Sequence, residues 1–178
     1  MLAAQIVKLF PDKFPGDPSI AAVTLRVSLN HLMQEHAYLG SMATSAVIAG
    51  RDPEKAATSA ALDANAASLH AAFKDEFGSS AGDQLGRLWA ARNTALLDYA
   101  AGVGAAAKQA LSQLFIAPFS AAAGVPQTLV DDQASAALAV VDDQRAKAFT
   151  TLAADDRAAA AAIETIADAM AAAGSVQG

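Results

Sequence analysis

The amino-acid sequence predicts an all-α protein: an antiparallel helical bundle of about six helices arranged as three αα-hairpins, with a short helix before it. Apolar residues recur at spacings of three and four, which is the period of a helix, whereas alternating runs typical of strands are missing. Glycine, proline and capping residues interrupt this pattern at intervals of a helix length. Hydrophobic residues make up 54% of the chain, and the many alanines among them favour long, closely packed helices.

The N-terminal part predicts a short helix and a loop before the bundle begins. Residues 2–10 have helical spacing, and Pro11 ends the run. The segment PDKFPGDPS contains three prolines and a glycine, so we expect a loop there. A long helix then begins at the end of this segment and continues to Ala49.

The segment GRDPE, residues 50–54, is the clearest turn in the sequence. Gly50 closes the first long helix, Asp52 is placed to cap the next one, and Pro53 suits a first helical position. The second long helix then runs to Gly78, where another break is predicted.

Glycines and a proline delimit the third and fourth long helices. The third begins at Ser79 or Ser80 and ends before Gly102. The fourth follows Gly104, and Pro118 marks either a kink in it or its early end.

The last two helices are predicted over residues 127–141 and 146–173. The polar segment VDDQR between them is either a tight turn or a charged stretch in mid-helix. Short connections of this kind make successive helices antiparallel neighbours. The three hairpin turns are predicted near Arg51, Val103 and Asp143.

The length of 178 residues suits one domain. We therefore predict a single helical-bundle domain over residues 1–178. Residues 1–18 form its short helix and Pro-rich lead-in, and residues 174–178 form a flexible tail.

His36 is the most unusual residue of the first long helix, because it lies on the apolar stripe between Leu32 and Leu39. If the first hairpin turns near residue 51, antiparallel pairing brings His36 level with Asp63 and Asn65. We therefore predict that one or both of these side chains lie opposite the imidazole.

The other two hairpins carry comparable polar residues in their apolar stripes. Asn93 follows Trp89 by four residues, and Gln133 follows Val130 by three. The same turn arithmetic places Gln113 opposite Asn93, and Asp155 or Asp156 opposite Gln133. The candidate ligand-binding residues are therefore His36, Asp63, Asn65, Trp89, Asn93 and Gln133.

These polar residues allow two interpretations. They form a pocket inside the bundle for a small ligand, or they are satisfied core groups that fix the register of the helices. As a register device, His36 would be replaceable by leucine unless a partner were left unpaired. A third reading makes His36 a metal ligand or the axial ligand of a haem, with Met33, Met42, Tyr38 and Trp89 around it.

Several classes of chemistry lack their usual sequence signals. The chain has no cysteine, no Gly-x-Ser-x-Gly elbow, no phosphate-binding glycine loop and no Glu-x-x-His pair of a di-metal site. A net charge of -6 without a basic block argues against a nucleic-acid partner. The longest uncharged stretch, residues 109–130, contains two prolines, so we predict no transmembrane segment.

Three segments resemble a group of uncharacterised bacterial all-helical proteins. They are LAAQIVKLFPDKFPGDPS, LRVSLNHLMQEHAYLG and ALDANAASL, with FPDKFPGDPS, QEH-Y-L and LDAN as the similar motifs. The resemblance implies the same helical fold and one histidine per hairpin, at His36 and at the positions of Asn93 and Gln133, as a metal or haem site requires. This chain has only the first of these histidines. Some members of the group carry a secretion signal or further repeats, which is compatible with a secreted or cell-surface location in bacteria.

These observations predict a non-enzymatic binding or structural module, whose partner is an unknown small ligand or protein and which needs no cofactor. The first alternative is a metal- or haem-binding bundle centred on His36. The second is a phasin-like protein of lipid or granule surfaces, suggested by the alanine-rich amphipathic helices.

Overall fold

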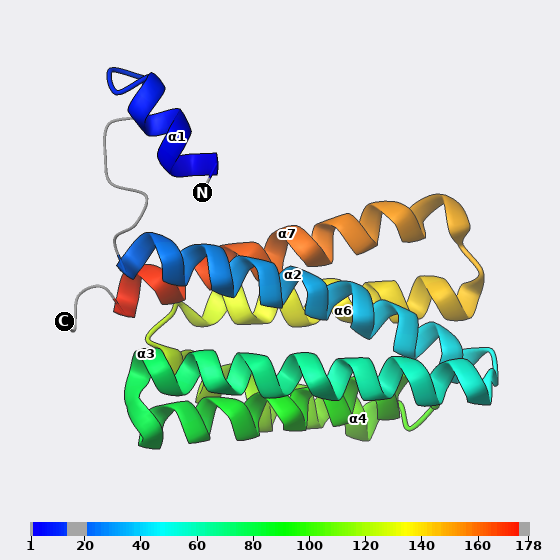
Figure 1. The fold of residues 1–178 in the computed structure, drawn as a ribbon. Coiled ribbons are helices and arrows are strands. Elements are labelled where there is room, and N and C mark those ends of the chain that lie inside the picture. Colours follow the sequence, from blue (N-terminus) through cyan, green and yellow to red (C-terminus); the bar gives the residue numbers. More distant parts are fainter. Residues whose placement is uncertain (1, 14–20, 175–178) are drawn as a thin grey trace.

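The computed structural model describes residues 2–13 and 21–174, and these residues form an antiparallel helical bundle (Figure 1). No strand occurs in the described part of the chain, so the predicted all-α class is confirmed. The predicted Pro-rich loop and the C-terminal tail lie largely outside the described residues. The elements are α1 (Leu2–Leu9), α2 (Ala21–Ile48), α3 (Asp52–Ala100), α4 (Ala105–Ala110), the π-helical turn η1 (Leu111–Ile116), α5 (Ala117–Ala123), α6 (Gln127–Ala146) and α7 (Phe149–Gly174).

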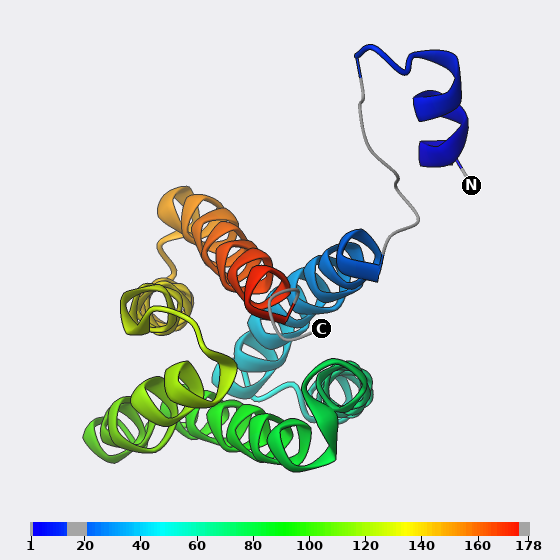
Figure 2. The same cartoon turned by 90° about the vertical axis from the view of Figure 1, so that its left-hand side faces the viewer.

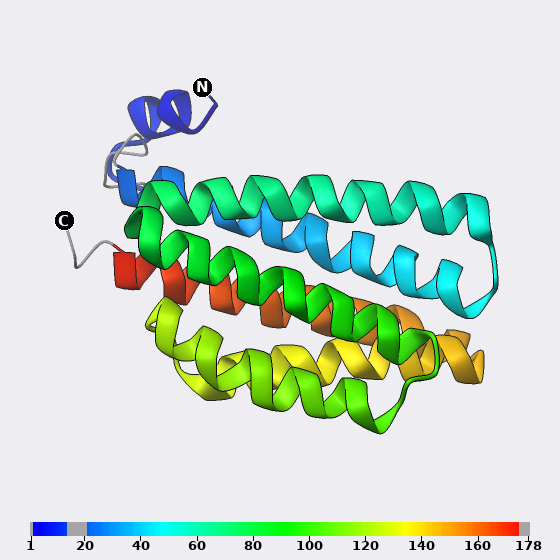
Figure 3. The same cartoon turned by 90° about the horizontal axis from the view of Figure 1, so that it is seen from below.

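Helix α3 consists of two arms that fold back on each other at Gly78. This glycine has φ 77° and ψ 165°, a conformation that interrupts the helix and that side chains disfavour. Figure 3 shows the arms, residues 52–77 and 79–100, running antiparallel. The predicted break between the second and third long helices is therefore confirmed, and a single residue makes it.

Two further glycines let the arms of α3 lie close together. A Cβ atom at Gly82 would lie 2.5 Å from Lys74 Cα, and one at Gly86 would lie 2.5 Å from the ring of His70. In each pair the two residues are equally far from Gly78 along the chain, as expected for an antiparallel hairpin that turns there. A larger side chain at Gly82 would meet backbone, so the arms would have to separate.

The turn between α2 and α3 lies where the sequence predicts it, but its cap differs. Gly50 has φ 62°, and Arg51 occupies the N-cap position without a side-chain capping bond. Asp52 is already the first helical residue, so the predicted cap was wrong. Its carboxylate, together with Glu54, instead lies in the first turn, where it favourably meets the positive end of the helix dipole.

Pro118 kinks the fourth long helix without ending it. The chain passes from α4 through η1 into α5, which carries Pro118 in its first turn. A proline lacks the N–H that a regular helix would use and crowds the preceding turn. A local π-helical turn relieves that crowding and shifts the faces that follow.

The turn between α6 and α7 comes four residues later than predicted. Helix α6 continues through the VDDQR segment, and Lys147 ends it in the left-handed conformation with φ 57°. The helix persists because Gln144 and Arg145 find partners outside it: Gln144 Nε2 donates to Ser41 O, and Arg145 Nη2 donates to Tyr99 O. For the VDDQR segment the sequence allowed a tight turn or a charged stretch in mid-helix, and the helical stretch is correct.

The core lies where α2, α3, η1, α5, α6 and α7 meet, and Figure 2 shows these helices nearly end-on. Four aromatic side chains fill its centre, with ring centroids 4.9 to 6.4 Å apart in tilted and edge-on pairs. They are Phe73, Trp89, Phe115 and Phe119, and each is at most 1% exposed. None of the described helices is both long and apolar enough to cross a membrane.

Candidate functional site

A polar centre lies inside the bundle, beside the aromatic core. His36 of α2 is 1% exposed and reaches both arms of α3. Its Nδ1 lies 2.7 Å from Asn65 Oδ1, and its Nε2 lies 2.8 Å from Asn93 Oδ1. Three residues that the sequence places on separate apolar stripes are thus brought together.

The neighbours of Asn65 determine which nitrogen of His36 carries the proton. Asn65 Nδ2 donates to Leu32 O at 2.9 Å and to Glu35 Oε2 at 2.8 Å, which orients its Oδ1 towards the imidazole. Nδ1 of His36 therefore donates to Asn65 Oδ1. A neutral imidazole then offers Nε2 as an acceptor, and Arg92 Nη1 lies 3.4 Å from that atom as a donor.

His36 stays neutral because a positive charge there is doubly unfavourable. Burial first, and then the charge of Arg92, lower the pKa of His36 from 6.5 to about 3, against the smaller opposing effects of the two asparagines. The neutral form is therefore the only one populated at neutral pH.

Arg92 is the unexpected member of the polar centre, since it is 3% exposed. Burial lowers the pKa of its guanidinium to about 10, which leaves it charged at neutral pH. Among the described residues no carboxylate lies within 4.0 Å of it. Its strongest contacts are Nε to Gln133 Oε1 at 3.2 Å and the face of Trp89, 5.1 Å from the guanidinium carbon.

The side-chain amide of Gln133 in α6 is only half paired. Its Oε1 accepts from Arg92, whereas its Nε2 is buried with no partner in the described part of the protein. The residue is 1% exposed. Buried amide donors are nearly always paired, so this one requires an explanation.

A small cavity joins these groups. Its volume is about 20 Å³, enough for one or two water molecules or a group of similar size. His36, Arg92 and Gln133 line it on one side, and Asp156 of α7 contributes the one carboxylate of its lining. The remaining lining residues are Ala37, Gly40, Ser41, Thr44, Leu96, Ala137, Val140, Val141 and Ala159.

Of the remaining predicted residues, one lies in the polar centre and two lie outside it. Trp89 belongs to it, with Nε1 3.4 Å from His36 Nδ1 and the two rings 5.0 Å apart. Asp63 is exposed, because it lies on the opposite side of α3 from Asn65. Gln113 is also exposed, since it lies within the π-helical turn η1.

Arg92 was missed because a charged residue on a helix is usually solvated. A signal was nevertheless present: Arg92 follows Trp89 by three residues and precedes Leu96 by four, which places it on the same apolar stripe. The neighbouring Asn93 was predicted from the same kind of spacing, since amides are more common inside proteins than guanidinium groups.

The described residues contain no group of three or more His, Cys, Asp or Glu side chains that could hold a metal ion. Both ring nitrogens of His36 face asparagine amides. A metal or haem at His36 stays a prediction. Its other ligands would have to come from groups outside the described residues around His36.

Comparisons with protein-family models, with curated proteins and with solved structures find no match for this chain. The resemblance to bacterial helical proteins therefore stays a prediction as well.

Proposed function

We propose that this chain is a non-enzymatic binding module, and that its polar centre binds a small polar ligand through a hydrogen-bond-accepting group. One observation carries the proposal: among the described residues, Gln133 Nε2 is buried without a partner beside Arg92, a buried cation that no carboxylate pairs with. Both groups line the same cavity. Buried donors and charges of this kind destabilise a fold unless something pairs with them.

The cavity also limits the chemistry of the ligand. An acceptor oxygen would meet Arg92 and Gln133, while Asp156 on the lining favours a donor group on the ligand's other side. The volume of about 20 Å³ admits only a few heavy atoms. Formamide has this combination of groups in three heavy atoms, and formate has the acceptor alone.

A binding role without catalysis agrees with the state of His36. Its pKa of about 3 makes the imidazole a weak base at neutral pH, and both nitrogens face amides. The other described residues of the cavity supply no thiol and no hydroxyl that hydrogen-bonds to this histidine.

The test measures thermal unfolding with formamide or with formate, each at constant ionic strength. A ligand that binds only the folded protein raises the melting temperature, and above Kd the rise grows with the logarithm of the ligand concentration. We expect such a rise for the wild type and for Arg87→Met, an exposed control on the same arm of α3. Arg92→Met should abolish it.

Gln133→Glu provides a variant that tests the site without removing the arginine. The new carboxylate would pair with Arg92 and replace the unpaired amide donor, so we expect a gain of about 1 to 2 kcal/mol in unfolding free energy. The ligand-dependent rise in melting temperature should disappear, since the carboxylate at residue 133 now supplies the acceptor for Arg92. A lower stability, or an unchanged response to both probes, would contradict the proposal.

A further inference from the structure

We propose that a second, larger pocket at the turn end of the bundle binds a small organic carboxylate with an apolar body. The pocket has a volume of about 400 Å³, within the range of small-molecule sites. It lies between the last turn of α2, the last turn of α6 and the first turn of α7. Cationic and apolar side chains share its lining, among them Arg51, Arg145, Lys147, Ile48, Phe149 and Leu152.

This turn-end pocket is separate from the polar centre. The two linings share no residue. Gln144 lines the turn-end pocket and bonds to residues of the other lining: its Nε2 donates to Ser41 O at 2.9 Å, and its Oε1 accepts from Thr44 Oγ1 at 2.9 Å. Substitutions at residues that line one pocket and not the other therefore distinguish the two sites.

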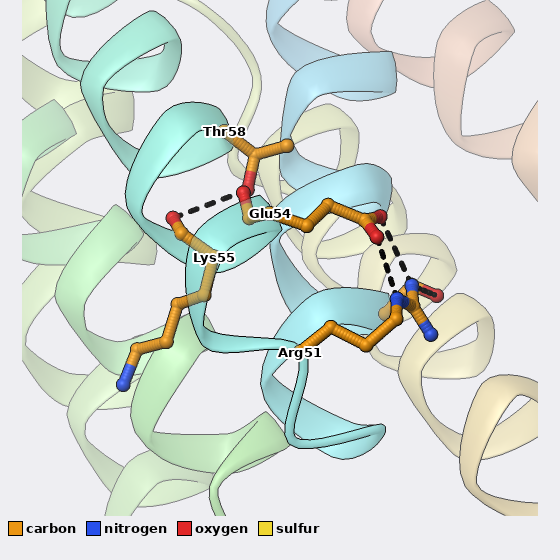
Figure 4. A network of polar contacts seen from close by, with 5 residues as sticks. Arg51, Glu54, Lys55 and Thr58 are labelled. Carbon is orange, nitrogen blue, oxygen red and sulfur yellow. Dashed lines mark hydrogen bonds and ion pairs between the residues drawn. The ribbon is translucent and has the colours of Figure 1, made fainter.

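The charge of the turn-end pocket contrasts with that of the whole chain. The protein has a net charge of -6, yet three cations line this pocket. Arg51 is held by Glu54, with Nε to Oε2 at 2.6 Å, and Arg145 Nη1 lies 3.3 Å from Asp142 Oδ1. Figure 4 shows the Arg51–Glu54 pair and the ammonium of Lys55 pointing away from it.

Lys147 is the cation of this lining that is available to a ligand. Its ammonium makes no ion pair or hydrogen bond with any residue that the structure describes. Its backbone has φ 57°, a conformation at a helix end where glycine is the usual residue. A lysine in this position carries backbone strain that a glycine would avoid, and such strain is typical of functional positions.

The apolar part of the lining gives the ligand its second feature. Phe149 is 72% exposed, and it stands beside the half-buried Ile48 and Leu152. An exposed aromatic ring next to an unpaired ammonium suits a molecule that has a carboxylate at one end and a hydrocarbon group at the other.

The experiment measures binding of benzoate and hexanoate to the full chain by isothermal titration calorimetry. Benzamide is the neutral control, and inorganic sulfate tests charge without an apolar body. We expect both carboxylates to bind and both controls to bind at least about tenfold more weakly, because benzamide lacks the charged contact and sulfate lacks the apolar one. Equal binding of benzamide or sulfate, or no binding of either carboxylate, would overturn the proposal.

Variants locate the site. Lys147→Gly removes the ammonium and fits the left-handed backbone, so the protein should fold while benzoate affinity falls about tenfold. Phe149→Ala should weaken the same binding. Lys55→Gln, a cation of the same bundle end that does not line the pocket, should leave it unchanged, as should Gln133→Glu. Unaltered affinity in Lys147→Gly would refute this location.

Discussion

Two arginines in this protein have opposite surroundings. Arg26 of α2 has a side chain that is 59% exposed, and it forms two hydrogen bonds to Asp168 of α7, with Nε to Oδ1 at 2.7 Å. Arg92 is 3% exposed and has no carboxylate partner among the described residues. The ion pair thus belongs to the exposed arginine, Arg26, whose charge water would have solvated without it.

The contrast shows that ion pairing for stability does not explain the polar centre. Exposed pairs contribute little to folding, whereas a buried unpaired charge is costly. A core of this size could have placed an apolar side chain at residue 92. Arg92 therefore keeps a buried charge beside Gln133 Nε2, which has no partner in the described part of the protein, and the proposed ligand would pair with both.

The largest expected effect comes from breaking the polar centre at His36. His36→Leu leaves Asn65 Oδ1 and the Asn93 amide buried without their partner, so we expect a loss of about 2 to 4 kcal/mol in unfolding free energy. Urea denaturation measures it. Adding Asn65→Leu and Asn93→Leu to this variant should recover part of the loss, because no stranded amide remains. Unchanged stability in His36→Leu alone would show that these hydrogen bonds are dispensable.

The pH dependence of stability is the next effect. The pKa of His36 falls from 6.5 to about 3 on folding, so the unfolded chain binds the additional proton between these values. Stability should therefore fall with decreasing pH, by about 1.4 kcal/mol per pH unit. Between about pH 6.5 and pH 5, where carboxylates titrate little, the loss should approach about 2 kcal/mol.

His36→Gln isolates this contribution, because glutamine does not titrate. The variant should lose less stability than the wild type over the same pH range, by the amount attributed to His36. Parallel pH profiles for the two proteins would contradict a neutral, buried His36.

The sequence predicted that His36, Asn65, Asn93 and Gln133 lie on apolar stripes, and it predicted the hairpin that brings His36 and Asn65 together. His36 and Asn65 meet because the turn at Gly50 lies where the glycine indicated. Arithmetic along the chain could not separate Asn65 from Asp63, since both are at the right level and only one faces inwards.

The other two predicted pairings had different outcomes. Helix α6 continues to Lys147, so its turn comes later than predicted, and Asp156 lines the same cavity as Gln133 without being paired to it. Gln113 lies in the π-helical turn η1 and is exposed, whereas Asn93 is buried. Residue spacing shows neither the contacts of Gln144 and Arg145 with other helices nor the π-helical turn.

The smallest expected effect sharpens the contrast between the two arginines. Arg26→Gln breaks an exposed pair, so the change in unfolding free energy should be well below that of His36→Leu. It should shrink further as ionic strength rises from about 0.01 M to about 1 M, because the screening length falls from about 30 Å to about 3 Å. The stabilisation in Gln133→Glu, which pairs a buried charge, should persist under the same conditions. If the stability changes in Arg26→Gln and Gln133→Glu depended equally on salt, Arg92 would be effectively solvated. No ligand would then be needed to explain why no described carboxylate pairs with it.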